Sequence, residues 1–132
     1  MSIENNKNFG LVPSVLICDS HYMTRSSFAL LAKEIGSCEV VEASDIKTAK
    51  IKCEGVSFDL ILLGIDEGNE EISLIKLIRD NHLLPQKDVP IIVMLKEITL
   101  EKLTELKSLN VAEIILKPTR MKTIYDTFLR YL

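Results

Sequence analysis

Several side chains that could bind an ion come directly after short apolar runs of this sequence. Asp19 and Ser20 follow one such run, and Lys117 follows another and precedes Pro118. A carboxylate in this setting has two common uses, as an oxygen ligand for a hard cation such as Mg²⁺ or as a cap for the helix that follows. Lys117 is likewise either a partner for an anion or part of a turn shaped by a cis peptide bond to Pro118. The elements that position these residues decide what they can do together.

Two kinds of segment alternate along the chain from about residue 14. Short apolar runs with β-branched residues favour buried strands, and segments with apolar residues three or four positions apart favour helices. The predicted strands are 15–18, 39–41, 60–63, 91–95 and 113–116. The predicted helices are 23–35, 45–54, 70–81, 99–109 and 120–132.

This alternation predicts an α/β fold. Because right-handed crossovers return the chain in the same direction, the five strands should form one parallel sheet with helices on both faces, a three-layer, doubly wound architecture. We expect residues 14–132 to form this domain and residues 1–13, which are rich in Asn, to be a loose extension. In such sheets the working site lies beyond the carboxyl ends of the strands, where the residues named above would meet.

The length and charge of the chain limit its function classes. A chain of 132 residues with 47% apolar content makes one domain with one sizeable core. The formal net charge of −3 gives no general attraction for nucleic acid or for an anionic membrane, so neither is an expected partner. Residues 96–132 carry 7 basic and 5 acidic side chains, and this local excess favours an acidic protein partner.

The cysteines and the apolar runs indicate a cytoplasmic protein. The chain has 3 cysteines with no C-x-x-C spacing, which is typical of reduced thiols. Its apolar runs are much shorter than a membrane span, and the N-terminus lacks the apolar region of a secretion signal. We therefore expect a soluble protein that is not secreted.

Four stretches of the sequence resemble, in order and spacing, a known family. They are VLICDSHYMTR, FDLILLGID, VPIIVML and NVAEIILKP. Together they are similar to the first, third, fourth and fifth strands of bacterial response-regulator receiver domains, over residues 14–132. The resemblance implies the flavodoxin-like fold of the chemotaxis regulator and a place in two-component signal transduction, with a histidine kinase or another signalling protein as partner.

The receiver pattern is incomplete in this chain. In a working receiver, a carboxylate at the end of the third strand attacks a phosphodonor, and together with two acids after the first strand it holds Mg²⁺. Gly64 stands at the nucleophile position, and a glycine cannot accept a phosphoryl group. In a gapless alignment Asp19 and Ser20 take the two acid positions; with one inserted residue, Cys18 and Asp19 take them. One acid is missing in either alignment.

Other positions of the phosphorylation pocket also differ. Receivers have a Ser or Thr after the fourth strand that contacts the phosphoryl group, and an aromatic residue on the fifth strand that changes rotamer. This chain has Leu95 and Ile114 at these positions. Lys117 and Pro118 keep the family pattern, and we expect Lys117 to pair with Asp19. The resemblance thus implies a degenerate receiver, or pseudo-receiver, with no cofactor and at most weak Mg²⁺ binding at Asp19.

The function implied is that of a signalling or adaptor protein that is not an enzyme and acts through protein contacts, without conventional Asp phosphorylation. Receivers commonly meet partners through the fourth helix, the fifth strand and the fifth helix. The candidate contact residues on this face are Ile98, Leu100, Ile114 and Lys122.

Two alternatives remain. In one, Asp66 of the acidic loop after Gly64 accepts phosphate with the help of Mg²⁺. In the other, the chain is a small flavodoxin-like cofactor-binding protein, although its strand-to-helix turns lack a glycine-rich phosphate loop. His21 and His82 lie far apart in sequence without flanking ligands, so they do not predict a metal site.

Overall fold

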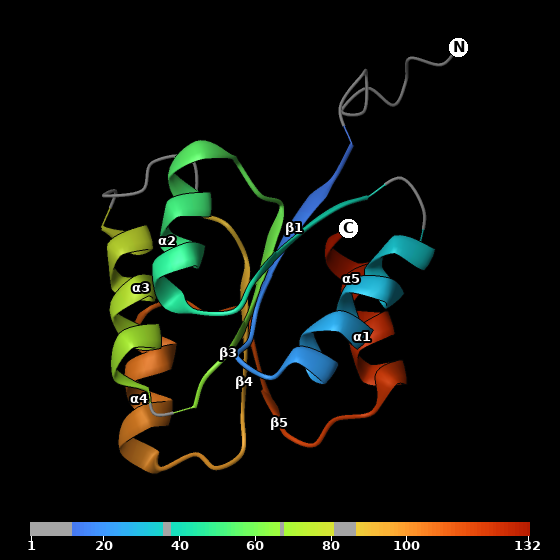
Figure 1. The fold of residues 1–132 in the computed structure, drawn as a ribbon. Helices are drawn as coiled ribbons and strands as arrows, with labels where there is room; N and C mark the ends of the chain where they lie inside the picture. Colours follow the sequence, from blue (N-terminus) through green and yellow to red (C-terminus); the bar gives the residue numbers. More distant parts are fainter. Residues whose placement is uncertain (1–11, 36–37, 67, 81–86) are drawn as a thin grey trace.

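The structure is a computed structural model that describes residues 12–35, 38–66, 68–80 and 87–132. Its centre is a 5-stranded parallel sheet in the order β2-β1-β3-β4-β5 (Figure 1). The strands are β1 (Ser14–Cys18), β2 (Glu39–Ala43), β3 (Leu60–Gly64), β4 (Ile91–Leu95) and β5 (Glu113–Leu116). The helices are α1 (Tyr22–Glu34), α2 (Ile46–Gly55), α3 (Asn69–Arg79), α4 (Leu100–Ser108) and α5 (Met121–Tyr131). The predicted doubly wound α/β fold is confirmed.

The observed boundaries of β4 and β5 are the predicted ones, and those of the other elements differ by one or two residues, often because a predicted first helical residue is a cap. Asp45 accepts a hydrogen bond from the Thr48 backbone N–H at 2.7 Å, and Thr99 accepts one from the Lys102 backbone N–H at 3.1 Å. Such caps satisfy backbone donors that a helix leaves free in its first turn. Residues 1–11 of the expected extension and His82 lie outside the described residues.

Two layers of helices cover the sheet. Helices α1 and α5 pack on one face, and α2, α3 and α4 pack on the other (Figure 1). Side chains of a strand alternate between the two faces. In β3, Leu60 and Leu62 therefore pack with Phe128 of α5, whereas Ile61 and Leu63 pack in the cluster on the α2–α4 side. Every residue of β1, β3 and β4 is buried, which explains their near-continuous apolar sequences.

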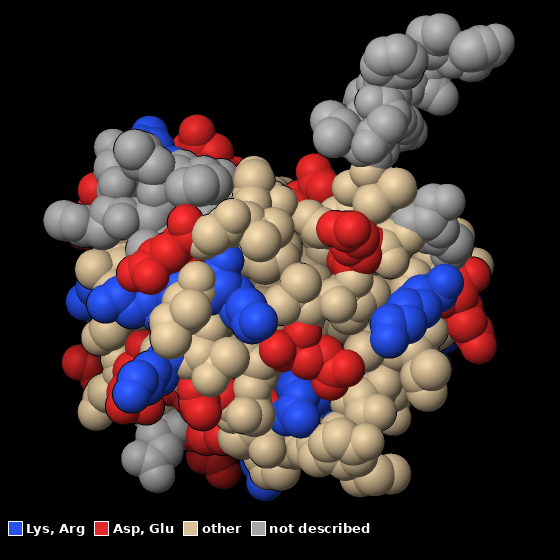
Figure 2. Space-filling view, turned by 45° about the horizontal axis from the view of Figure 1, so that its top comes forward, with Lys and Arg blue, Asp and Glu red and all other residues tan. Residues whose placement is uncertain are grey.

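Charged side chains of both signs are mixed on one face of the molecule. Figure 2, which turns the upper side of Figure 1 toward the viewer, shows Lys and Arg interspersed with Asp and Glu on that face. On the face drawn there, the described residues do not form a single basic field. Among the described helices, none is both long and apolar enough to cross a bilayer.

Candidate functional site

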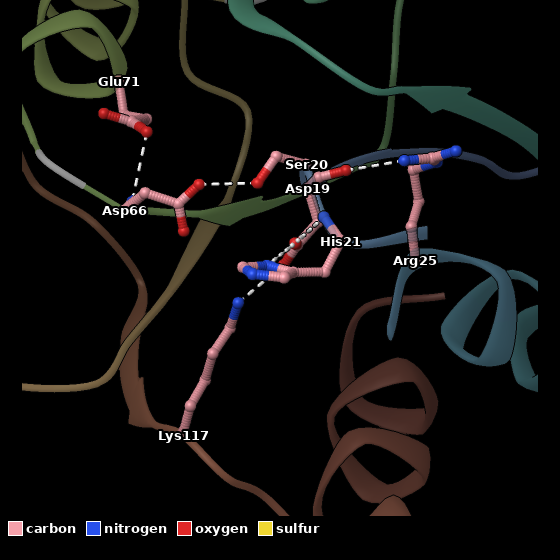
Figure 3. Close-up of polar contacts among 7 residues, drawn as sticks. All are labelled: Asp19, Ser20, His21, Arg25, Asp66, Glu71 and Lys117. Atoms are coloured by element: carbon pink, nitrogen blue, oxygen red, sulfur yellow. Dashed lines mark hydrogen bonds and ion pairs between the residues drawn. The ribbon is translucent and has the colours of Figure 1, made fainter. Parts of the chain in front are cut away.

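The carboxyl ends of three strands bring Asp19, Gly64 and Lys117 together. The register of β1 and β3 pairs Cys18 with Leu63, so Asp19 and Gly64 are the next residues along two adjacent strands. Lys117 follows β5, and its Nζ donates a hydrogen bond of 2.8 Å to Asp19 Oδ2 (Figure 3). The expected pairing of Lys117 with Asp19 is thus present, between residues 98 positions apart in the chain.

Asp19 is buried, and both of its carboxylate oxygens have partners. Its side chain is 1% exposed and that of Lys117 is 13% exposed. Besides Lys117, the carboxylate accepts from the His21 backbone N–H at 2.8 Å and lies 3.2 Å from His21 Nδ1. Arg25 donates to the Asp19 backbone oxygen at 2.8 Å. The helix begins after His21, so Asp19 makes a turn with the residue two positions on and does not cap α1 directly.

Gly64 has no room for a side chain. A Cβ atom built on Gly64 would lie within van der Waals overlap of Asp19 Oδ2, 2.8 Å from Asp19 Cγ and 3.3 Å from Lys117 Nζ. The Asp19–Lys117 pair therefore occupies the space in which a side chain at position 64 would begin. A side chain at position 64 would therefore displace the Asp19 carboxylate from its present place.

Ser20 and Asp66 form a second polar contact beside the ion pair. Ser20 Oγ donates to Asp66 Oδ2 at 2.6 Å, and the Asp66 backbone N–H donates to Glu71 Oε2 at 3.1 Å (Figure 3). Glu71 also accepts from the Gly68 backbone N–H, which ties the loop after β3 to the start of α3. Asp66 is thus held by the loop from β1 and by α3, beside the Asp19–Lys117 pair.

A cleft of about 470 Å³ lies over these residues. Leu95, at the end of β4, forms part of its wall and is otherwise buried in the core, with 2% of its surface exposed. The charged side chains that line the cleft are Asp66, Lys96, Glu97, Lys102 and Lys117. The cleft therefore has more cationic than anionic groups, and its wall at Leu95 offers no hydroxyl.

The residues present do not fit a Mg²⁺ site. Mg²⁺ needs several oxygen ligands in near-octahedral geometry. Asp19 already uses both carboxylate oxygens on Lys117 and His21, and Gly64 offers no ligand. Within the described ranges, no group of three or more His, Cys, Asp and Glu side chains is placed to hold a metal ion.

Cys18 lies away from this site. Its thiol packs in the core of the α2–α4 side and donates a weak hydrogen bond to the Asp45 backbone oxygen at 3.8 Å. Burial raises the pKa of the Cys18 thiol to about 12 and that of the Cys53 thiol to about 11. Both thiols are neutral near pH 7 and unreactive there, because the thiolate is the nucleophilic form. At the end of β1, the polar side chains at the site are Asp19 and Ser20.

The four candidate contact residues on the α4–β5–α5 face differ in exposure. Leu100 is 78% exposed and the Lys122 side chain 79% exposed, whereas Ile98 and Ile114 are half-buried and pack against the core. Leu116, 52% exposed, belongs to this face and was not predicted. Its exposure follows from the position of β5 at the edge of the sheet, which the apolar sequence of β5 does not reveal.

The sequence matches no described protein family and no curated protein. Several solved structures are similar in fold. The chemotaxis protein CheY4 of Vibrio cholerae has a TM-score of 0.78 and 24% identity, over 92% of this chain and 99% of that one. A response regulator receiver protein from Pseudomonas putida has a TM-score of 0.76 and 21% identity, over 90% and 96% of the two chains. A response regulator from Thermotoga maritima has a TM-score of 0.74 and 22% identity, over 92% and 98%. The structural neighbours are CheY-like receiver domains, and this chain has the receiver fold.

Proposed function

We propose that this chain is a receiver-like signalling or adaptor module of the two-component type, which acts through protein contacts without enzymatic turnover and without conventional Asp phosphorylation. The observation that supports the proposal is the arrangement of residues at the end of β3. Gly64 supplies no nucleophile, and the Asp19–Lys117 ion pair fills the space beside it. Phosphorylation at this position would need a nucleophilic side chain, which glycine does not have, and the ion pair lies where such a side chain would begin.

The site also lacks the contacts through which a phosphoryl group would shift the conformational equilibrium of a receiver. In a working receiver, the group contacts a hydroxyl and a lysine and so shifts an equilibrium between two states. Here Leu95 has no hydroxyl, and Lys117 is already bound to the Asp19 carboxylate. The proposal is therefore that the protein keeps one state, which its partner reads constitutively.

The partner is proposed to bind the face formed by α4, β5 and α5. Leu100 and Leu116 offer exposed apolar side chains on this face, and Lys122 offers an exposed charge. Apolar contacts would supply most of the binding energy, and the local excess of basic residues favours an acidic partner surface. A histidine kinase or another signalling protein is the proposed class of partner.

Intact mass after treatment with acetyl phosphate and Mg²⁺ tests the absence of phosphorylation. We expect no added phosphoryl mass in the wild-type chain. The alternative acceptor is Asp66, whose carboxylate lies at the cleft with Lys96 and Lys102. A phosphoryl adduct that disappears in Asp66→Asn would contradict the proposal and establish this atypical receiver instead.

Partner capture tests the location of the function. Leu100→Asp should weaken capture of a signalling partner, whereas Ile51→Asp should not, because Ile51 is 58% exposed on α2, away from the proposed face. The double variant Asp19→Asn/Lys117→Met should keep binding if the pocket has no signalling role. Loss of capture in the folded double variant, together with normal capture by Leu100→Asp, would place the function in the pocket.

A further inference from the structure

Another cavity borders the cleft described above, on the side of α1 and α5. It has a volume of about 600 Å³, within the range of about 300 to 1,000 Å³ that is typical of pockets for small molecules. The cavity and the cleft share four lining residues, which are His21, Lys96, Glu97 and Lys117. The other lining residues belong to the first turns of α1 and to residues 118–121, which lead into α5. We call this space the α1–α5 cavity.

Apolar side chains from both sides line the α1–α5 cavity. Met23 and Phe28 belong to α1, Pro118 lies in the loop before α5, and Met121 is the first residue of α5. Met23 is 74% exposed and Met121 is 42% exposed, and both side chains are flexible enough to adapt to what they contact. Water gains no hydrogen bonds from an apolar wall. These residues therefore suit the apolar body of a ligand.

Two lysines that line the cavity offer hydrogen-bond donors. Lys117 is 13% exposed, and its Nζ donates one hydrogen bond, of 2.8 Å, to Asp19. An ammonium group has three N–H donors, which leaves two for an acceptor in the cavity. Lys96 is exposed just after β4 and forms no ion pair with the described acidic residues. Ammonium groups with free donors favour oxygen acceptors, and they bind anionic ones most strongly.

The starts of α1 and α5, which border the cavity, also favour an anion. The other three helices satisfy donors at their starts with side chains of their own, through the caps Asp45 and Thr99 and through Glu71 at the start of α3. Neither α1 nor α5 has a side-chain cap, and neither has an acidic residue in its first turn. The partial positive charge of these two helix ends therefore adds to that of the lysines.

We propose that the α1–α5 cavity binds a small organic acid that has one carboxylate and an apolar body. The carboxylate accepts hydrogen bonds from Lys96 and Lys117. The apolar body lies against Met23 and Met121, and its burial adds the affinity that an exposed ion pair lacks. The binding of such a ligand needs no residue at position 64, so this proposal does not rest on the proposed function.

Acidic groups near the lysines limit the ligand to one negative charge. Glu97 lines the cavity, and the buried Asp19 carboxylate already accepts from Lys117. Both groups repel an anionic ligand, and a dianion such as a phosphate ester meets about twice the repulsion of a monoanion. A neutral ligand such as an alcohol is a weaker acceptor for the ammonium donors than a carboxylate is. A monocarboxylate is therefore the charge state that this lining favours.

Amide chemical shifts of the full chain during titration with 3-phenylpropionate test the proposal. This probe has one carboxylate and a phenyl group. We expect saturable shifts in residues 22–28 and 118–121, with a dissociation constant of about 1 mM or below. The alcohol 3-phenylpropanol has the same body without the charge, and acetate has the charge without the body. Each should bind about 10-fold more weakly or worse.

Three variants locate the carboxylate of the probe. Lys96→Met should weaken the binding of 3-phenylpropionate about 5-fold or more and leave the binding of 3-phenylpropanol unchanged. Lys102→Met is the matched control, because Lys102 lines the neighbouring cleft beside Asp66 and does not line the α1–α5 cavity. It should leave the dissociation constant unchanged. Glu97→Gln should tighten binding about 2-fold or more, because it removes a negative charge from the lining.

Four results would overturn the proposal. The first is the absence of saturable shifts up to about 20 mM 3-phenylpropionate, well above the expected dissociation constant. The second is equal binding of 3-phenylpropanol, and the third is tighter binding of phenyl phosphate. The fourth is an equal loss of affinity in Lys102→Met and Lys96→Met, which would place the acid in the neighbouring cleft. None of these results bears on phosphorylation, which the mass measurement tests separately.

Discussion

The interior of the sheet and its carboxyl end belong to the same strands, yet they are held together in different ways. In the interior, β1, β3 and β4 are buried at every residue and make apolar contacts on both faces. At the carboxyl end, the contacts are polar, and the buried Asp19 carboxylate is paired with Lys117. The interior is stabilised by many similar apolar contacts, whereas at the carboxyl end of the sheet the buried charge of Asp19 depends on the charge of Lys117. The two regions should therefore respond differently to substitution.

The largest effect is expected in the interior. Phe128 of α5 is fully buried, and Phe128→Ala should lower the free energy of unfolding by about 3 to 5 kcal/mol, because it removes apolar contacts and leaves a cavity. The neighbouring Leu129 is 53% exposed, so Leu129→Ala is a matched control with an expected loss below about 1 kcal/mol. Urea unfolding of the two variants measures both values. Equal losses would show that α5 is not packed as described.

The second effect concerns the ion pair at the carboxyl end. Lys117→Met leaves the buried Asp19 carboxylate without its cationic partner and should cost about 3 kcal/mol of stability at pH 7. Asp19→Asn/Lys117→Met removes both charges, and it should be clearly more stable than the single variant because no unpaired charge remains. Urea unfolding of the wild type and both variants gives the comparison. A double variant no more stable than Lys117→Met would refute the assignment of the cost to an unpaired carboxylate.

A third, smaller effect is expected at Gly64. Gly64→Ala places a methyl group where the Asp19 carboxylate lies, and it should cost about 1 to 3 kcal/mol, since Asp19 cannot move without losing Lys117 and His21. Gly55→Ala is the matched control, because a Cβ at Gly55 meets nothing within 4 Å. Gly64→Asp adds a second carboxylate to the same space and should not restore phosphorylation. Efficient labelling of Gly64→Asp by acetyl phosphate would show that the pocket opens more readily than the ion pair implies.

Much of the interior could be predicted from the sequence, because burial leaves a periodic trace. The apolar run ending at Leu63 and the run ending at Leu116 both correspond to observed strands, and the alternation with helices gives the parallel sheet. The rule that ligands bind beyond the carboxyl ends of strands also predicted that Asp19 and Lys117 lie in one site.

Three features could not be predicted from such a pattern. The sequence does not show that Asp19 approaches Gly64 so closely, because that contact depends on a side-chain rotamer. The four residues of β5 read like a buried strand, although β5 is an edge strand whose Leu116 is half exposed. Arg79 is similar, since it donates hydrogen bonds to the backbone oxygens of Val89, Leu109 and Asn110. Contacts of a side chain with distant backbone have no periodicity from which they could be predicted.

The smallest effect is a pH dependence of stability that arises from a buried thiol of the interior. Below pH 9 the Cys53 thiol is protonated in both the folded and the unfolded chain. Above pH 9 the thiol of the unfolded chain loses its proton. In the folded chain, burial raises the pKa of Cys53 to about 11, so the thiol stays protonated up to that pH. Stability should therefore fall as the pH rises through this window. In reducing buffer, the drop in unfolding free energy between pH 7.5 and 9.5 should be smaller in Cys53→Ala than in the wild type by about 1 kcal/mol or less. Titration of lysines and tyrosines contributes equally to both proteins, so it cancels in this comparison. An identical drop in the two proteins would mean that water reaches Cys53 and that the interior on the α2 side is less tightly closed than its burial indicates.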